Sequence, residues 1–243
     1  MCGIAGIISK DPNIVTKARL QLMTDSLHHR GPDGQGYWIN NANCAGLGHR
    51  RLSIIDLSTA AAQPMHYAGR YTITYNGEIY NYIELKETLL KKGYTFSSTC
   101  DTEVILAAYA CYGKECLQQF DGMFAFAIWD DTNQTLFCAR DRFGEKPFYY
   151  VNDHHQFIFA SEMKALWAAG IQKQMKPGRL LTYLTLGIIS NAADQHETFY
   201  DHITTLPAGH YLLLHYNHSN TAHAYTAGVK SYWDIDTETM LAP

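Results

Sequence analysis

The chain has 243 residues, of which 47% are hydrophobic, 13% aromatic and only 17% charged, against roughly 25% charged in an average soluble domain. So apolar a composition excludes an intrinsically disordered protein, and the length allows one large domain or two small ones with a sizeable core. The net charge of −4 excludes the basic surface of a typical nucleic-acid-binding protein, and the shortage of charge suggests a surface that a partner covers.

Strand patterns occur in groups, with helical patterns between the groups. In chain order we predict a strand at 4–8, a helix at 13–27, strands at 36–39, 45–48, 52–55 and 71–75, helices at 82–92 and 101–113, strands at 123–129, 135–139, 148–151 and 157–160, a helix at 161–169 and a strand at 211–216. Asn76-Gly77 favours a tight turn, and the polar stretch 217–229 favours a loop. Strict βαβ alternation and a glycine-rich phosphate loop are absent, so the fold class is α+β or layered α/β rather than a Rossmann sheet.

Targeting and metal-binding signals are missing from the sequence. No apolar run approaches the roughly 18 residues of a membrane span, and the N-terminus lacks the basic segment and cleavage site of a signal peptide. The six cysteines form no Cys-x-x-Cys pair, which favours free thiols in a reducing cytoplasm. The 12 histidines show no ligand spacing, so we predict no metal site.

Cys2 is the residue that indicates chemistry most directly. Removal of Met1 would place its thiol and a free α-amine on one residue. An α-amine has a pKa near 8, so it can act as the base that activates the thiol. The alternative is a small apolar residue at the start of a strand.

Nine short motifs follow one another across most of residues 2–215. They are MCGIAGI at 1–7, RGPDGQG at 30–36, GHRRLSIID at 48–56, QPM at 63–65, YNGEIYN at 75–81, CDTEVIL at 100–106, GMFAFAIWD at 122–130, ARDRFGEKP at 139–147 and ASEMK at 160–164. In this order they resemble the glutaminase domain of glutamine-dependent asparagine synthetases. The resemblance favours this family over the class II amidotransferases that make glucosamine phosphate or phosphoribosylamine.

The resemblance implies a four-layer αββα sandwich of the N-terminal nucleophile (Ntn) hydrolase type, with two stacked, mostly antiparallel sheets. It also implies that Cys2 attacks the side-chain carboxamide of glutamine and releases ammonia. The side-chain amide of Asn76 and the backbone N–H of Gly77 match the family's oxyanion hole.

Further residues match the family's contacts to the amino-acid end of glutamine. Arg51 matches the position that binds the α-carboxylate, and Asp101, with Glu78 close by, the position that binds the α-ammonium. Without the resemblance, Arg51 would be a surface residue and Asp101 a helix N-cap. The backbone of the segment after Arg51 lines the same pocket in relatives: Leu52, Ser53, Ile54 and Ile55.

The resemblance also sets the expected organisation and partners. We expect residues 2–216 to form the glutaminase domain and 217–243 a linker toward a missing synthetase domain. That domain, which uses ATP and Mg²⁺ to amidate aspartate to asparagine, would receive the ammonia, so this chain needs no cofactor. The expected partners are glutamine and the synthetase domain or subunit, with a homodimer left open and no nucleic acid or membrane.

Two alternatives remain for the function. The chain could be a non-catalytic structural or docking domain, as in the β-lactam synthetase branch, whose members lack the N-terminal cysteine that is present here. It could also be a glutaminase that serves a different amide acceptor, such as a sugar or a peptide.

Overall fold

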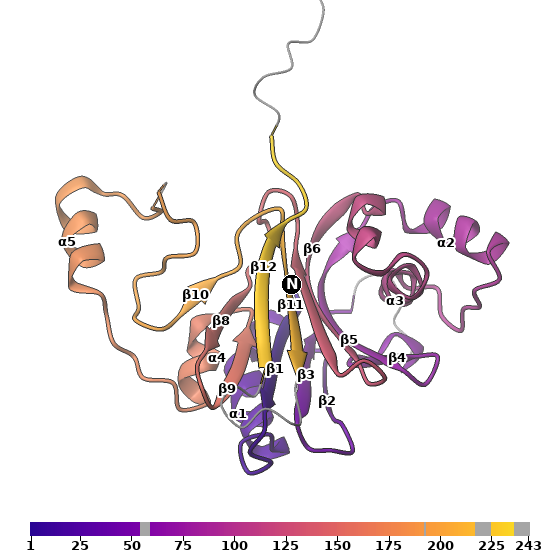
Figure 1. The fold of residues 1–243 in the computed structure, drawn as a ribbon, viewed down its shortest axis with the longest axis horizontal. Helices are drawn as coiled ribbons and strands as arrows, with labels where there is room; N and C mark the ends of the chain where they lie inside the picture. The colour runs from indigo at the N-terminus through magenta and orange to yellow at the C-terminus, as the bar shows by residue number, and fades with distance from the viewer. Residues whose placement is uncertain (54–58, 192, 217–224, 236–243) are drawn as a thin grey trace, which may run out of the picture.

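Two six-stranded antiparallel sheets lie face to face in the computed structural model, which describes residues 1–53, 59–191, 193–216 and 225–235 (Figure 1). The strands of sheet 1 are β1 (Gly3–Ser9), β2 (Gly34–Ile39), β3 (Ala45–Arg51), β8 (Tyr149–Asn152), β9 (Gln156–Ala160) and β10 (Thr204–Thr205). Those of sheet 2 are β4 (Met65–Tyr67), β5 (Tyr71–Ile79), β6 (Gly122–Asp130), β7 (Thr135–Arg140), β11 (His210–Tyr216) and β12 (Tyr225–Ser231). The strand orders are β10-β8-β9-β1-β3-β2 and β12-β11-β7-β6-β5-β4.

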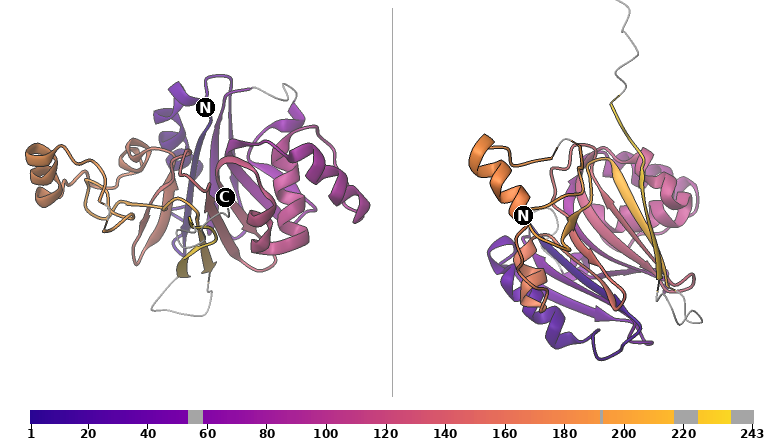
Figure 2. Two further views of the ribbon diagram at one scale, coloured as in Figure 1. Left: turned by 90° about the horizontal axis from the view of Figure 1, so that it is seen from above. Right: turned by 60° about the vertical axis from the view of Figure 1, so that its left-hand side comes forward.

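Helices cover the outer face of each sheet. α1 (Lys17–Ser26) and α4 (Met163–Ala168) contact sheet 1, whereas α2 (Tyr82–Lys91) and α3 (Asp101–Tyr112) lie on the side of sheet 2 (Figure 2). The predicted four-layer αββα sandwich is therefore confirmed. A further helix, α5 (Pro177–Leu186), lies at one end of the molecule, away from the stacked layers (Figure 1).

The central strands are apolar on both faces because each sheet is covered on both sides. In β6, Phe124, Phe126 and Ile128 pack against the helices over sheet 2. The alternate residues Ala125 and Ala127 point into the core between the sheets. This double burial explains the continuous apolar run in the sequence, since neither face of the strand meets water.

Hydrogen bonds also join the two sheets directly. His49 in β3 is fully buried, and its Nε2 lies 3.1 Å from the carbonyl oxygen of Tyr75 in β5. A carbonyl oxygen only accepts, so Nε2 carries the proton. Burial, with a smaller effect of Arg51, lowers the pKa of His49 to about 4, which keeps the ring neutral at pH 7. Nearby, the Thr74 hydroxyl donates to the carbonyl oxygen of Gly48 at 3.0 Å.

Three local predictions were wrong. Asn76 and Gly77 do not form a turn but continue β5, where they pair with Ala125 and Phe124 of β6. The predicted loop 217–229 is a strand from residue 225 onward, because β12 pairs with β11. The predicted strand 52–55 is not present at 52–53, which lie beyond the end of β3, and residues 54–55 lie outside the described residues. The linker role of 217–243 stays a prediction.

The exposed apolar side chains concentrate on α5 and the residues that follow it. The exposed fractions are 62% for Leu181, 70% for Leu184 and 70% for Ile189. The buried guanidinium of Arg179 holds this segment, because it donates to the carbonyl oxygen of Ile189 at 2.8 Å and forms an ion pair with Glu197 at 3.2 Å. None of the helices in the described part of the chain is long and apolar enough to cross a membrane.

Candidate active site

A cavity of about 150 Å³ lies where residues from the beginning of β1, the end of β3, the second half of β5 and the start of α3 meet. On the same measure a single water molecule needs roughly 10–15 Å³, so the cavity has room for a small-molecule ligand. The lining includes these residues predicted from the sequence: Cys2, Arg51, Leu52, Asn76, Gly77, Glu78 and Asp101.

The thiol of Cys2 faces the segment that follows β3. The backbone N–H of Leu52 donates to Sγ at 3.3 Å, and Sγ lies 3.6 Å from the carbonyl oxygen of the same residue. Burial raises the pKa of the thiol, and the Leu52 N–H, the N-terminal ammonium and Arg51 offset part of that rise. The thiol is therefore protonated at neutral pH, and a nucleophilic role requires a base that takes its proton.

Asn76 and Gly77 both line the cavity. The side-chain nitrogen of Asn76 is buried and has no hydrogen-bond partner within the described residues. A buried donor without an acceptor is costly, so this one is suited to an oxyanion that forms only during a reaction. Gly77 cannot carry a side chain, because a Cβ there would collide with the carbonyl oxygen of Met123.

Acidic side chains occupy the wall of the cavity at the start of α3. The N-cap of this helix is Cys100, so the predicted N-cap alternative for Asp101 is wrong. Asp101 instead accepts hydrogen bonds from the Tyr75 hydroxyl at 2.7 Å and from the Ile79 N–H at 3.1 Å. Burial raises the pKa of Asp101, and the bond from Tyr75 opposes that rise. Glu78, half-buried in β5, adds a second carboxylate to the lining.

The two adjacent arginines at the end of β3 have different surroundings. Arg51 lines the cavity, as predicted. Arg50 turns toward α1, where its guanidinium bonds the Asp25 carboxylate and the carbonyl oxygen of Thr24. Of the two arginines, Arg51 is therefore the one that lines the cavity.

The segment after Arg51 is only partly covered by the structure. Leu52 lines the cavity, but Ser53 does not, since its N–H donates to Asp33 at 2.8 Å. Ile54 and Ile55 lie outside the described residues, so their assignment to the pocket stays a prediction.

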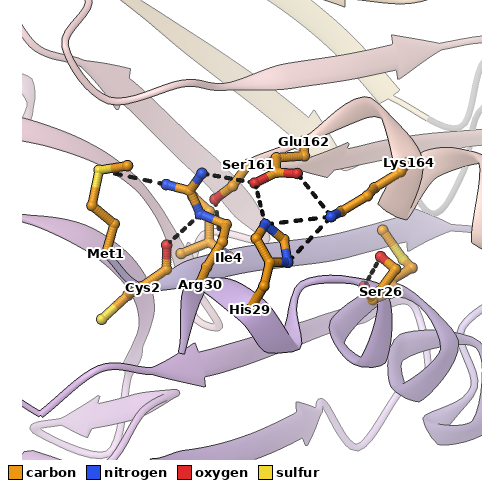
Figure 3. A network of polar contacts seen from close by, with 10 residues as sticks. Met1, Cys2, Ile4, Ser26, His29, Arg30, Ser161, Glu162 and Lys164 are labelled. Atoms are coloured by element: carbon orange, nitrogen blue, oxygen red, sulfur yellow. Dashed lines mark hydrogen bonds and ion pairs between the residues drawn. The ribbon is translucent and has the colours of Figure 1, made fainter. Parts of the chain in front are cut away.

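A polar network behind the thiol fixes the first residues of the chain (Figure 3). The buried guanidinium of Arg30 donates from Nε to the carbonyl oxygen of Cys2 at 2.9 Å and from Nη1 to Glu162 at 2.9 Å. Its Nη2 lies 3.8 Å from the sulfur of Met1. His29 and Lys164 also contact Glu162, at 2.9 and 3.2 Å. Figure 3 shows Arg30 between the first two residues and this carboxylate.

Replacing Glu162 by glutamine should destabilise the chain at pH 7 but not at pH 2. Burial raises the pKa of Glu162, but hydrogen bonds from Arg30, His29 and Lys164 outweigh it and lower the pKa to about 2. A lowered carboxyl pKa contributes stability above the unfolded-state value of about 4.3, and the contribution disappears as the pH falls toward 2. We expect a loss of about 1–2 kcal/mol at pH 7 in denaturant unfolding, which shrinks as the pH falls through this range.

The control for this variant is Glu115→Gln, whose side chain is 68% exposed in a loose pair with Lys114. It should leave the unfolding free energy within about 0.5 kcal/mol at both pH values. Equal losses for the two variants at pH 7 would contradict a special role of Glu162.

Several residues of the lining were not anticipated from the sequence. Tyr75 orients Asp101, and the side chain of Gln63 accepts a bond from the Tyr75 N–H at 2.6 Å. Lys146 is 6% exposed and also lines the cavity. It belongs to the motif at 139–147, but no spacing rule connects that motif with Cys2, which lies far away in sequence. Within the described residues no group of three His, Cys, Asp or Glu side chains could hold a metal ion, and the prediction of no metal stays a prediction.

Comparisons with known proteins show the family of the chain. The sequence profile of a glutamine amidotransferase domain matches residues 1–233. Asparagine synthetase (glutamine-hydrolyzing) 1 of Bacillus subtilis is 43% identical over 193 residues, which are 78% of this chain and 30% of that protein. A putative asparagine synthetase (glutamine-hydrolyzing) 2 of Methanocaldococcus jannaschii is 40% identical over 209 residues, 78% of this chain and 40% of that protein. The chain thus spans only a minor part of the length of these relatives.

The fold also has a counterpart among solved structures. Glutamine phosphoribosylpyrophosphate amidotransferase from B. subtilis superimposes with a TM-score of 0.66 at 18% identity, covering 96% of this chain and 49% of that one. This likeness concerns the fold alone. The profile match and the relatives at 40% and 43% identity show that the chain belongs to the class II glutamine amidotransferase family.

Proposed function

We propose that this chain hydrolyses glutamine to glutamate and ammonia, with Cys2 as the nucleophile once Met1 has been removed. The observation that carries the proposal is the unpartnered, buried amide nitrogen of Asn76 in the cavity that the Cys2 thiol lines. In a non-catalytic docking domain the thiol of Cys2 and the amide of Asn76 would have no function together, since a buried donor without an acceptor only costs stability. The intact pair therefore favours the enzyme over the docking alternative.

The proposed reaction proceeds in two stages. The α-amine of Cys2 takes the thiol proton, and the thiolate attacks the carboxamide carbon, so that a C–S bond forms and the carbonyl π pair moves to oxygen. The Asn76 amide and the Gly77 N–H stabilise this oxyanion. The protonated amine gives its proton to the departing nitrogen, the C–N bond breaks and ammonia leaves. Water then attacks the thioester, the C–S bond breaks, and glutamate and the thiol are released.

The charged groups of the lining fit the two ends of the amino acid. The Arg51 guanidinium can bind the α-carboxylate with two hydrogen bonds. Asp101 and Glu78 provide the negative charge for the α-ammonium. With both charged ends bound in this way, the carboxamide of the substrate would face Cys2.

The proposed role of the ammonia follows from the relatives, which are named glutamine-hydrolyzing asparagine synthetases. We propose that the nitrogen serves the ATP-dependent amidation of aspartate to asparagine in a synthetase part. ATP and Mg²⁺ would bind to that part and not to this chain, which needs no cofactor for the hydrolysis. A sugar or peptide acceptor is the alternative. The six cysteines are free thiols, which supports a reducing, cytoplasmic location.

We also propose that the exposed apolar face formed by Leu181, Leu184, Leu186, Ile188 and Ile189 docks onto the synthetase part. Monomeric proteins rarely leave so many neighbouring large apolar side chains in water. Arg179 holds this face in a defined conformation, so it is not a loose segment. In a protein like the B. subtilis relative, the remaining part would supply the surface that covers this face, because this chain spans only 30% of that protein's length.

The double variant Leu184→Gln, Ile189→Gln tests the apolar face. If the face is reserved for a partner, the variant should unfold within about 0.5 kcal/mol of the wild type, because both side chains contribute little to the chain's own core. It should also bind less of a dye that reports exposed apolar surface. The wild type should sediment as a monomer. If the wild type is instead a dimer and the double variant is a monomer, a second copy of this chain covers the face. That result would contradict the proposal that the synthetase part covers it.

The test of the central proposal is an assay of glutamate and ammonia release from glutamine. It uses chain whose intact mass confirms the loss of Met1. Stoichiometric release of the two products supports the proposal. Correctly processed, folded chain that binds glutamine without hydrolysing it would favour the docking alternative.

A further inference from the structure

Lys146 places a buried positive charge against the first residue of the chain. Its side chain lines the cavity and is 6% exposed, and its Nζ lies 3.6 Å from the sulfur of Met1. Among the described residues no carboxylate oxygen lies within 4.0 Å of this nitrogen. A buried ammonium without a carboxylate is costly for the fold, and such groups concentrate at functional sites.

The loop that carries Lys146 is held at both backbone groups of this residue. The Lys146 N–H donates to Asp141 Oδ2 at 3.0 Å, and its carbonyl oxygen accepts from Arg140 Nε at 2.7 Å. Asp141 also accepts from the N–H groups of Phe143 and Glu145, and Arg140 donates to the carbonyl oxygen of Gly144. These bonds fix the backbone from which the Lys146 side chain starts, and burial limits the conformers that are open to that side chain.

The other cation at this end of the chain is already balanced. Arg30 also contacts the Met1 sulfur, but Glu162 forms an ion pair with it at 2.9 Å. Lys146 is thus the cation beside Met1 for which the described residues supply no ion pair.

The remaining charged and titratable groups of the cavity belong to other elements. Arg51 comes from β3, Glu78 from β5 with the buried Tyr75, and Asp101 from α3. Under the proposed function Arg51 faces the α-carboxylate of glutamine, and Asp101 and Glu78 face its α-ammonium. Lys146 is the cation of the lining whose Nζ lies 3.6 Å from the sulfur of Met1, beside the chain terminus.

We propose that the Lys146 ammonium keeps the freed α-amine of Cys2 in its neutral form, so that this amine can accept the thiol proton. The inference rests on the proposed function, because it requires that Met1 is removed and that Cys2 is the nucleophile. A positive charge close to an amine disfavours protonation of that amine. Lys146 accordingly acts through the protonation state of the Cys2 α-amine and does not touch the reacting atoms.

The experiment is the pH dependence of kcat/KM for glutamine hydrolysis in the wild type, Lys146→Gln, Lys146→Met and Lys146→Arg. The acid limb of this profile reports the base of the free enzyme. In the glutamine and methionine variants it should move about one pH unit upward, so that activity falls about tenfold on the acid side and recovers at alkaline pH. The arginine variant keeps the charge and should keep the wild-type limb.

The control is Lys114→Gln, since the Lys114 side chain is 54% exposed and lies in the short helical turn after α3, outside the cavity. It should leave the whole profile unchanged. A structural role of Lys146 would lower kcat/KM by the same factor at every pH, and an unmoved acid limb in Lys146→Gln would overturn the inference. Thermal melting of each variant confirms that the compared proteins are folded.

The activities of the wild type and of Cys2→Ala distinguish a failure of the proposed function from a failure of the inference about Lys146. If the processed wild type has no glutaminase activity, or if Cys2→Ala retains it, the proposed function is wrong. Suppose that the wild type is active, that Cys2→Ala is inactive, and that the acid limb of the pH profile is the same in the Lys146 variants. Then only the inference about Lys146 is wrong.

Discussion

Replacing Cys2 by alanine is expected to abolish glutamine hydrolysis while the fold persists. Removal of a covalent nucleophile lowers kcat by a factor on the order of 10⁶ in a well-studied protease, so a loss of at least about 10³-fold is the minimum here. The fold should persist because the thiol makes only long contacts with Leu52, at 3.3 and 3.6 Å. The measurement is glutamate release, with circular dichroism and thermal melting to check the fold.

Two controls make this result specific. Cys111→Ala removes a half-buried thiol that does not line the cavity and should leave the activity unchanged. A chain that retains Met1 keeps the thiol but has no free amine on Cys2, and should lose about 10²–10⁴-fold if that amine is the base. Full activity with Met1 retained would assign the proton transfer to another group.

Replacing Asn76 by alanine is expected to lower kcat about 10²–10³-fold, with a much smaller change in KM. The buried amide nitrogen of Asn76 has no partner among the described residues, so the variant breaks no hydrogen bond of that atom in the resting protein. The interaction would be formed with the oxyanion, which exists in the transition state and not in bound glutamine. Steady-state kinetics at saturating and limiting glutamine separate the two parameters.

The matched control for this variant is Asn152→Ala, an exposed position at the end of β8. It should change neither parameter. A rise in KM without a fall in kcat for Asn76→Ala would indicate that the amide binds the substrate rather than the developing negative charge.

The sequence is sufficient to predict most strands and the layered fold, because both faces of the central strands are buried and their apolar runs stand out. It fails at Asn76-Gly77, where local preference favours a turn. Pairing with Ala125 and Phe124 along β6 overrides that preference, and the small Gly77 allows the close approach to Met123. Local sequence preferences cannot predict this pairing, because the partner strand lies more than 40 residues away in sequence.

In the candidate site, too, residues within recognisable motifs can be predicted from the sequence, whereas contacts between distant parts of the chain cannot. The motif resemblance points to Cys2, Arg51 and Asp101, and the structure brings these three residues to one cavity, while their roles stay predictions. The role of Lys146 beside Met1 depends on a contact between residues 145 positions apart, which no pattern in the chain encodes. The strand β12 was also missed, because its sequence shows only a weak strand pattern and it lies at a sheet edge, where one neighbour suffices.

The hydrogen bonds between the sheets have a consequence for folding. The His49 ring joins β3 to the carbonyl oxygen of Tyr75, directly before Asn76, and the Thr74 hydroxyl joins β5 to the carbonyl oxygen of Gly48. These two bonds fix the wall of the cavity in one sheet against the other. Neither sheet alone contains both the thiol and the oxyanion donors. The pocket therefore exists only where the two sheets are docked, and ligand binding would select the docked sandwich alone. Glutamine should therefore act as a reporter of the docking of the two sheets.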